Sequence, residues 1–187
     1  MENEVLKTIL QRRSVRAFSE KQISDSELQL IIKAGLYAPS AMNEQNWHFT
    51  VVQNKELIDD MSYQSKAHGL GTGNDHIEKM MSNPKLHIFY NAPTVIVAST
   101  LIDGFASMVN TSAAIQNMLL AAHSLGIGSC WIGLSRYLFN SELRDEYQKR
   151  LNIPVEFLPN YCIALGYPKG NLPEIKPRLQ GTVNYVK

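Results

Sequence analysis

Residues 107–133, SMVNTSAAIQNMLLAAHSLGIGSCWIG, combine a long helical pattern with a strand pattern that follows it directly. Small and apolar side chains recur at helical spacing, which predicts one long helix over 107–126. Gly126 is the expected end of this helix, because glycine readily adopts the left-handed conformation of a helix C-terminus. One face of the helix carries Met108, Ile115, Met118, Leu119 and Ala122. This face, padded with alanines, predicts a central helix that is nearly buried.

Strand patterns recur along the chain. WHFTVV at 47–52 alternates and is rich in strand formers, and APTVIVAST at 92–100 is apolar, as in a buried strand. IGSCWIG at 127–133 predicts a strand that runs into a turn, and YCIALGYP at 161–168 predicts one that ends at a Gly-Tyr-Pro turn. Without repeats or internal linkers, these segments predict one α/β domain over 1–187 with about four or five strands.

Further helical patterns lie at 2–12, 24–37, 53–62 and 141–151. The second begins with a capping box, because Glu27 follows Ser24 by three positions. Ser141 is the expected cap of the last one. Between the second helix and the first strand, APSAMNEQN at 38–46 combines proline, serine and asparagine, which favour a loop.

Two stretches lack a regular pattern. Residues 64–90 contain Gly69, Gly71 and Gly73, and both a mobile lid and a loose connection fit this segment. Its GxGxG spacing is rejected as a dinucleotide motif, because no strand leads into it. The tail at 169–187 contains two prolines and is expected to be extended, with an apolar end suited to a strand that docks on another subunit.

Composition excludes several classes of protein. The chain is 44% hydrophobic and 19% charged with a formal net charge of +1, so no overall field favours nucleic acid. Two cysteines without a CxxC predict neither a disulfide scaffold nor a metal site. The charged N-terminus lacks a signal-peptide core, and no apolar run reaches the roughly 20 residues of a membrane span. We expect a cytoplasmic protein.

The histidines also lack metal-ligand spacing; they stand at positions 48, 68, 76, 87 and 123. His48 and His123 fall in regular elements and are interpreted as structural. His68 and His76 flank the glycine-rich segment and could enter an active site, as loop residues often do.

The segment RRSVRAF at 12–18 concentrates positive charge before a helix start. Spacing alone favours a solvated basic face. The alternative is a phosphate site, because arginine binds phosphate oxygens with two parallel N–H groups and a serine hydroxyl adds a donor.

Four separated stretches resemble, in this order, the nitroreductase family of flavin-dependent oxidoreductases, in the short branch with an SCWIG motif. They are RRSVRAF (12–18), APSAMNEQNWHF (38–49), AAHSLGIGSCWIG (121–133) and IALGYPKGNLPEIKPR (163–178). The resemblance implies an α+β, three-layer α-β-α fold with a central mixed, mainly antiparallel sheet. It also implies a homodimer that binds FMN at its interface and exchanges its extended C-terminal tails.

Within this family the basic motif binds the flavin. The resemblance carries cofactor contacts onto Arg12 and Ser14, and places Arg16 beside the isoalloxazine ring, with Arg13 in the same run contributing main-chain or side-chain bonds. Lys176 and Arg178 match basic positions that reach the same phosphate from the tail. The resemblance thus interprets the basic cluster as half of an anion clamp.

The loop PSAMNEQ matches a segment that reaches the partner subunit's flavin. Contact positions fall on Pro39, Ser40, Ala41 and Asn43, with Gln45 as a support for the loop. Ala41 replaces a serine common in the family, so one hydroxyl contact is lost. Without the family, an Asx turn explains the asparagine at 43 equally well.

SCWIG matches the strand end against the flavin ring. Cys130, Trp131, Ile132 and Gly133 would line one face there, and glycine permits close backbone approach. Many relatives carry a glutamate around Gly133, a difference that leaves substrate and nucleotide preference open. Asn110 matches a polar position near the flavin. Cys130 is interpreted as a small buried hydrophobe rather than a thiol nucleophile.

The implied activity is ping-pong reduction of a nitroaromatic, a quinone or another electron-poor small molecule, with NADH or NADPH as co-substrate. No side chain need act as a general acid, so no catalytic residue is predicted. Two alternatives remain: other redox chemistry on the same fold, such as dehalogenation, dehydrogenation or flavin breakdown, and a non-enzymatic flavin-binding sensor. The physiological acceptor and the choice between NADH and NADPH stay open.

Overall fold

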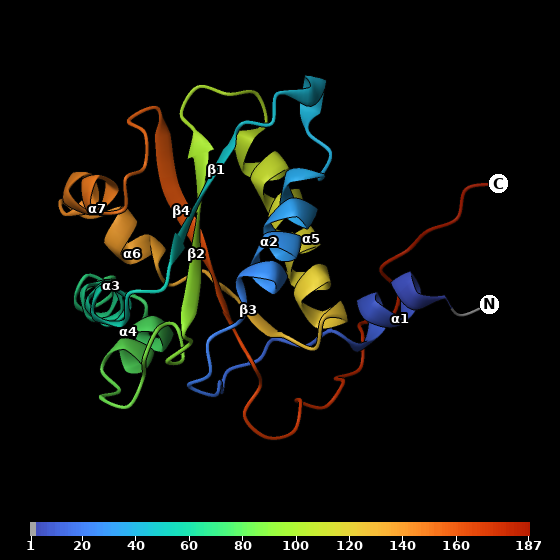
Figure 1. The fold of residues 1–187 in the computed structure, drawn as a ribbon, viewed down its shortest axis with the longest axis horizontal. Coiled ribbons are helices and arrows are strands. Elements are labelled where there is room, and N and C mark those ends of the chain that lie inside the picture. Colours follow the sequence, from blue (N-terminus) through green and yellow to red (C-terminus); the bar gives the residue numbers. More distant parts are fainter. Residues whose placement is uncertain (1–2) are drawn as a thin grey trace.

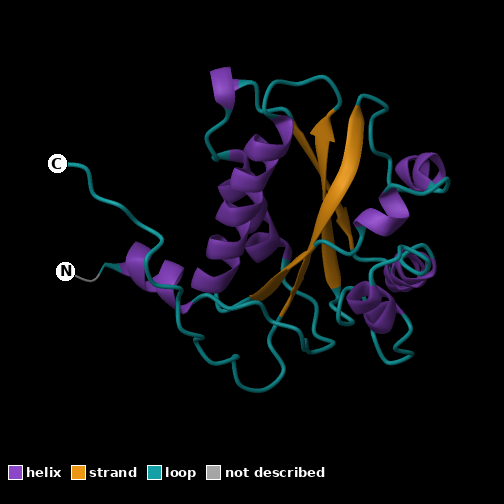
Figure 2. Ribbon diagram, turned by 180° about the vertical axis from the view of Figure 1, so that it is seen from behind, coloured by secondary structure: helices purple, strands orange, loops and turns teal. Residues whose placement is uncertain are grey.

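A four-stranded sheet lies between two groups of helices in the computed structural model, which describes residues 3–187 (Figures 1 and 2). The strands are β1 (Trp47–Val52), β2 (Thr94–Leu101), β3 (Gly128–Ile132) and β4 (Phe157–Gly166). They are ordered β1-β2-β4-β3, and each neighbouring pair is antiparallel. A single parallel bridge joins Ser14 to Ser129 at the β3 edge. The expected α+β fold with a mainly antiparallel sheet is confirmed.

One face of the sheet is covered by α2 (Asp25–Leu36) and α5 (Ser107–Ser124) (Figure 1). Their apolar side chains pack on the residues of β2 and β4 that face these helices, including Ile96 and Ile163. Gly126 has φ +73° just after α5, as its role at the helix end requires. The helix itself is buried along one side, but Met108 is 40% exposed, so its place on the predicted buried face is wrong.

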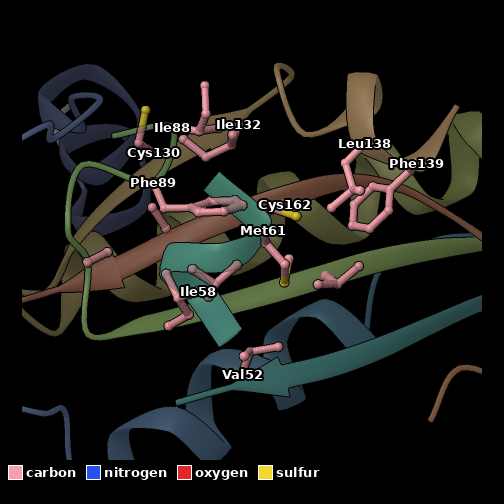
Figure 3. Close-up of a cluster of buried hydrophobic side chains, with 14 of the residues drawn as sticks. Val52, Ile58, Met61, Ile88, Phe89, Cys130, Ile132, Leu138, Phe139 and Cys162 are labelled. Atoms are coloured by element: carbon pink, nitrogen blue, oxygen red, sulfur yellow. The ribbon is translucent and has the colours of Figure 1, made fainter. Parts of the chain in front are cut away.

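The other face is covered by α3 (Lys55–Ala67), α4 (Asp75–Met81), α6 (Arg136–Phe139) and α7 (Arg144–Arg150). Figure 3 shows this core, in which Met61, Phe89 and Phe139 pack around the β4 residue Cys162. Cys130, at the rim of the cluster, comes from β3. The β-strand alternation places these side chains opposite those that face α2 and α5.

Several element boundaries differ from the sequence prediction. The helix predicted over 53–62 continues to Ala67, and α4 and α6 were not predicted, because seven and four residues are too short to show a period. Ser141 does not cap α7, which begins at Arg144 after Leu143; the Ser141 hydroxyl instead accepts from the Leu143 N–H at 3.1 Å. Strand β4 begins four residues earlier than predicted, where Pro159 sits beside a bulge that tolerates its missing N–H.

The N-terminal helix α1 (Glu4–Gln11) and the C-terminal tail lie on the same side of the molecule (Figure 1). Residue 2, the predicted start of α1, falls outside the described residues. The predicted apolar face of α1 exists, yet all four of its side chains are exposed in the single chain: Val5, Leu6, Ile9 and Leu10. The tail from 169 to 187 is extended and exposed, and contains no helix or strand.

Candidate functional site

The basic run 12–16 lies along the free edge of β3. Ser14 forms the parallel bridge with Ser129, and the Val15 N–H donates to the Ser129 carbonyl at 2.9 Å. A segment paired in this way is extended, so alternate side chains point to opposite sides. Arg12, Ser14 and Arg16 therefore share one side, and Arg13 shares the other with Val15.

Arg12, Ser14 and Arg16 surround the Cys130 thiol. Burial raises the pKa of Cys130 above its ordinary value, while the charge of Arg16, a hydrogen bond with Ser14 and the charge of Arg12 oppose this rise. The Cys130 residue is 3% exposed and belongs to the apolar core cluster. This environment suits a buried hydrophobe better than a nucleophile.

Arg178 joins this cluster from the other end of the chain. The pKa of Arg12 is lowered by burial and by repulsion from Arg13 and Arg178, with Cys130 acting in the opposite sense. Within residues 3–187, no carboxylate lies within 4 Å of either Arg12 or Arg178. Lys176 stands two positions before Arg178 on the same exposed tail. The cations are thus concentrated without an internal counter-ion, as expected for an anion site.

The end of β3 leaves backbone groups open beside these cations. Because β3 is an edge strand and the Ser129 carbonyl points outward, Trp131 and Gly133 present their outward groups on the same edge. The Trp131 ring packs edge-on to Tyr161, with the ring centres 5.5 Å apart, and Ile132 is buried. The side chains of Trp131 and Ile132 therefore pack within the protein. A Cβ at Gly133 would meet only Tyr161, at 4.0 Å. The strand edge therefore has room for a molecule against its backbone.

The loop between α2 and β1 forms a second group of predicted residues. Its 3-10 turn η1 (Ala41–Asn43) contains left-handed residues, and Gln45 is also left-handed with φ 47°. The Ser40 hydroxyl accepts from the Gln45 N–H at 3.0 Å, and the Gln45 side chain donates to the Asn43 side chain at 3.2 Å. Pro39 precedes this turn. The hydrogen bonds from Gln45 to Ser40 and Asn43 hold the loop in this conformation.

Asn110 belongs to this loop and not to the cations. Its side-chain oxygen accepts from the Ala41 N–H at 3.1 Å, and its NH₂ group donates to Asn46 at 2.9 Å and to the Phe105 carbonyl at 3.2 Å. Asn110 is 4% exposed, so its amide is a buried anchor for the loop.

The loop and the cations lie at opposite corners of the sheet. Ser129 pairs with Leu165, which pairs with Thr94 at one end of β2, whereas Trp47 pairs with Thr100 at the other end. Strand rise and strand spacing then separate the two groups by roughly 25 Å within one chain. A single chain therefore brings only part of the predicted site together.

Comparisons with known proteins decide the family. The model described as the nitroreductase family matches residues 9–167. The chain belongs to the nitroreductase family. A protein of Archaeoglobus fulgidus, provisionally named NADH dehydrogenase/NAD(P)H nitroreductase, is 37% identical over 169 residues, 89% of this chain and 86% of that protein. The NADPH-flavin oxidoreductase of Vibrio harveyi is 31% identical over 189 residues, 97% of this chain and 72% of that protein.

A solved nitroreductase from Bacteroides fragilis, crystallised with bound FMN, has the same fold. It is 35% identical, matches 100% of both chains, and superposes with a TM-score of 0.91. The expected family and the expected nitroreductase-like fold are therefore confirmed.

A groove of about 1030 Å³ adjoins Arg16 in this nitroreductase-family chain. Arg16 lies over the ring of Tyr90, with its guanidinium carbon 5.9 Å from the ring centre. Tyr90 and Asn91 are both left-handed, and the Asn91 N–H donates to Nδ1 of His87 at 3.2 Å. The sequence did not predict this turn, because His87 and Tyr90 lie in residues 64–90, which lack a regular pattern.

The remaining histidines take no part in this group. His68 pairs with Glu142 at 3.9 Å, and His76 is exposed on α4. No cluster of three or more His, Cys, Asp or Glu side chains suited to a metal occurs in residues 3–187. Over the same range, no helix is both long and apolar enough to span a bilayer.

Proposed function

We propose that this nitroreductase-family protein is an FMN-dependent NAD(P)H oxidoreductase that reduces nitroaromatics, quinones or related electron-poor molecules by a ping-pong scheme. The observation that carries the proposal is the basic run 12–16, which Ser14 bridges to the edge strand β3 and where Arg12, beside the charge of Arg178, has no carboxylate within 4 Å among residues 3–187. The names of the relatives support the same chemistry, since they couple NAD(P)H to nitro compounds or flavin.

The residues fit the phosphate of FMN. A phosphate monoester carries between one and two negative charges at neutral pH, so a single arginine would leave it incompletely neutralised. Arg12 and Arg178 supply two guanidinium groups, Ser14 adds a hydroxyl, and Lys176 brings a further cation from the tail. Charge-assisted bonds from several donors would hold the group in one orientation.

The flavin ring would lie against β3. When bound, FMN supplies hydride transfer, and the protein contributes binding, orientation and electrostatics. Gly133 has no side chain to block approach, and the outward N–H and C=O groups of Trp131 and Gly133 can contact the ring edge. Arg16 keeps a positive charge near that edge, which favours negative charge on the ring. No side chain is assigned a proton-transfer role.

A second copy of the chain would complete this site. The loop residues Pro39, Ser40, Ala41, Asn43 and Gln45 lie too far from Arg12 to contact the same cofactor from one chain. An apolar α1 face and an extended tail with exposed Leu179 and Val186 suit burial against a partner. We therefore infer a homodimer in which each loop, anchored by Asn110, contacts the partner's cofactor and the tails are exchanged.

The colour of the purified protein, which reports bound flavin and its reduction, tests the proposal. Purified protein should be yellow, and anaerobic NADH or NADPH should bleach it. A nitroaromatic or a quinone added afterwards should restore the colour without oxygen. Colourless protein that binds no added FMN would contradict the proposal. Yellow protein that neither nucleotide bleaches would favour other flavin chemistry or a sensor.

A further inference from the structure

A small cavity of about 70 Å³ lies behind the basic run, next to β3. Arg13, His123, Ser129 and Leu172 are among its lining residues. Its lining residues come from the basic run, from the C-terminal end of α5, from β3 and from the tail. Four separate segments therefore border it.

Arg13 lines this cavity and has an unused edge. Its Nη1 donates to the carbonyls of Leu10, at 2.9 Å, and of Arg12. Its Nε and Nη2 atoms are buried and have no hydrogen-bond partner among residues 3–187. These two atoms form one side of the guanidinium, where their N–H bonds run parallel and match two oxygens of one anion.

Ser129 provides a second unused donor. The residue is 1% exposed, and its Oγ has no hydrogen-bond partner among the described residues. The Ser129 carbonyl already accepts from the Val15 N–H, so the unmet side-chain group of this residue is its hydroxyl. A buried hydroxyl without a partner is costly, so an occupant that accepts from it would be stabilising.

The cavity is distinct from the proposed FMN clamp. Ser129 and Cys130 are neighbours on β3, so their side chains point to opposite faces. The Cys130 side has Arg12, Ser14 and Arg16, whereas the Ser129 side has Arg13. The spacing of the RRSVR segment thus places cations on both faces of the strand.

The electrostatics of the cavity favour an anion. Burial lowers the pKa of His123, and the charges of Arg12 and Arg13 lower it further, so His123 faces positive neighbours. No carboxylate in residues 3–187 lies within 4 Å of Arg13. An occupant without charge would leave the Arg13 guanidinium partly buried and unneutralised.

We propose that this cavity binds a small, free, planar oxyanion, of the class that includes nitrate and bicarbonate. Two of its oxygens accept from Nε and Nη2 of Arg13, and a third lies within reach of the Ser129 hydroxyl. The volume limits the occupant to a few heavy atoms, which excludes a phosphate ester or a nucleotide. The anion neutralises the guanidinium beside the clamp and ties the basic run to β3 and α5.

Nitrate is the probe for this site. FMN-loaded protein is melted in increasing sodium nitrate, with sodium chloride keeping the ionic strength constant. Wild-type protein should show a saturable rise in melting temperature. Ser129→Ala should weaken the apparent nitrate affinity about tenfold, through loss of a bond to a charged group. Ser99→Ala is the matched control, because Ser99 is also a fully buried serine with an unpartnered hydroxyl, on β2.

Arg13→Lys separates geometry from charge, since lysine keeps the charge but lacks the parallel N–H pair. It should lose the saturable response while circular dichroism shows a folded protein. A crystal grown in nitrate should show the planar ion on Arg13 and Ser129. An equal response in wild type and Ser129→Ala would overturn the proposal, and so would a cavity filled by water only or by a carboxylate of a second copy.

Discussion

The side-chain oxygen of Asn110 on α5 accepts a hydrogen bond of 3.1 Å from the Ala41 N–H, which ties the start of the η1 turn to the helix. The same amide donates to Asn46 and to the Phe105 carbonyl. One buried side chain therefore connects α5 to the loop that we propose contacts the partner's flavin.

Replacing Asn110 with alanine should detach this loop. Three hydrogen bonds are lost at a buried position, and unsatisfied buried groups cost about 1–3 kcal/mol each, so Asn110→Ala should lower the free energy of unfolding by at least about 1 kcal/mol. FMN content after purification should fall with it. Asn117→Ala is the control on the same helix and should retain flavin, because the Asn117 side chain donates to the Ala34 carbonyl of α2 and to no loop residue among 3–187.

His87 should make stability depend on pH. Its Nδ1 accepts from the N–H groups of Phe89 and Asn91, both at 3.2 Å, so this nitrogen carries no proton, while Nε2 lies 3.2 Å from Asp59. Burial lowers the pKa of His87, opposed by Asp59 and assisted by nearby lysines. A histidine with a lowered folded pKa contributes stability above its unfolded pKa of about 6.5, and this stability is lost as pH falls through the folded value.

Urea unfolding between pH 8 and pH 5 measures this effect. Wild-type protein should lose stability below about pH 6.5, whereas His87→Gln should show a flatter profile, because an amide accepts hydrogen bonds without titrating. The exposed His76→Gln should follow the wild-type curve. Identical slopes for wild type and His87→Gln would contradict this assignment.

The two thiols should be unreactive in the native protein. Burial raises the pKa of Cys162 to about 12 and also raises that of Cys130, despite the arginines around the latter. Thiolate is the reactive form, so a thiol reagent at pH 7 should modify neither cysteine until denaturant is added. Rapid native modification of Cys130 would show an activated thiol and reopen the question of a nucleophile.

Local sequence signals predicted much of the fold. The capping box of Ser24 and Glu27 is present as expected, and the strand 47–52 has the predicted bounds, because both depend on neighbouring residues. Helices α4 and α6 were missed because seven and four residues are too short to show a helical period. The start of β4 was missed because Pro159 disfavours a strand, and the bulge at Asn160 that accommodates it becomes visible only when β4 is paired with β2.

The candidate site was predictable only through the family resemblance. No local rule connects Arg12 with Arg178, which the fold brings together across nearly the whole chain. The resemblance also grouped Asn110 with the flavin, whereas in one chain it lies with the loop at the far corner of the sheet. Tyr90 and the Arg13 cavity had no sequence signal, because each depends on side-chain directions set by tertiary structure.

The affinity of the apoprotein for FMN tests the central proposal most directly. Arg12→Ala/Arg178→Ala removes two charge-assisted contacts to the phosphate, each contributing about 1.5–3 kcal/mol, so the dissociation constant should rise by at least about a hundredfold. Arg144→Ala/Lys149→Ala removes the same charge from the exposed surface of α7 and should leave affinity within about threefold of wild type. If the Arg12/Arg178 variant, folded by circular dichroism, bound FMN as tightly as wild type, the two arginines would not form the phosphate site.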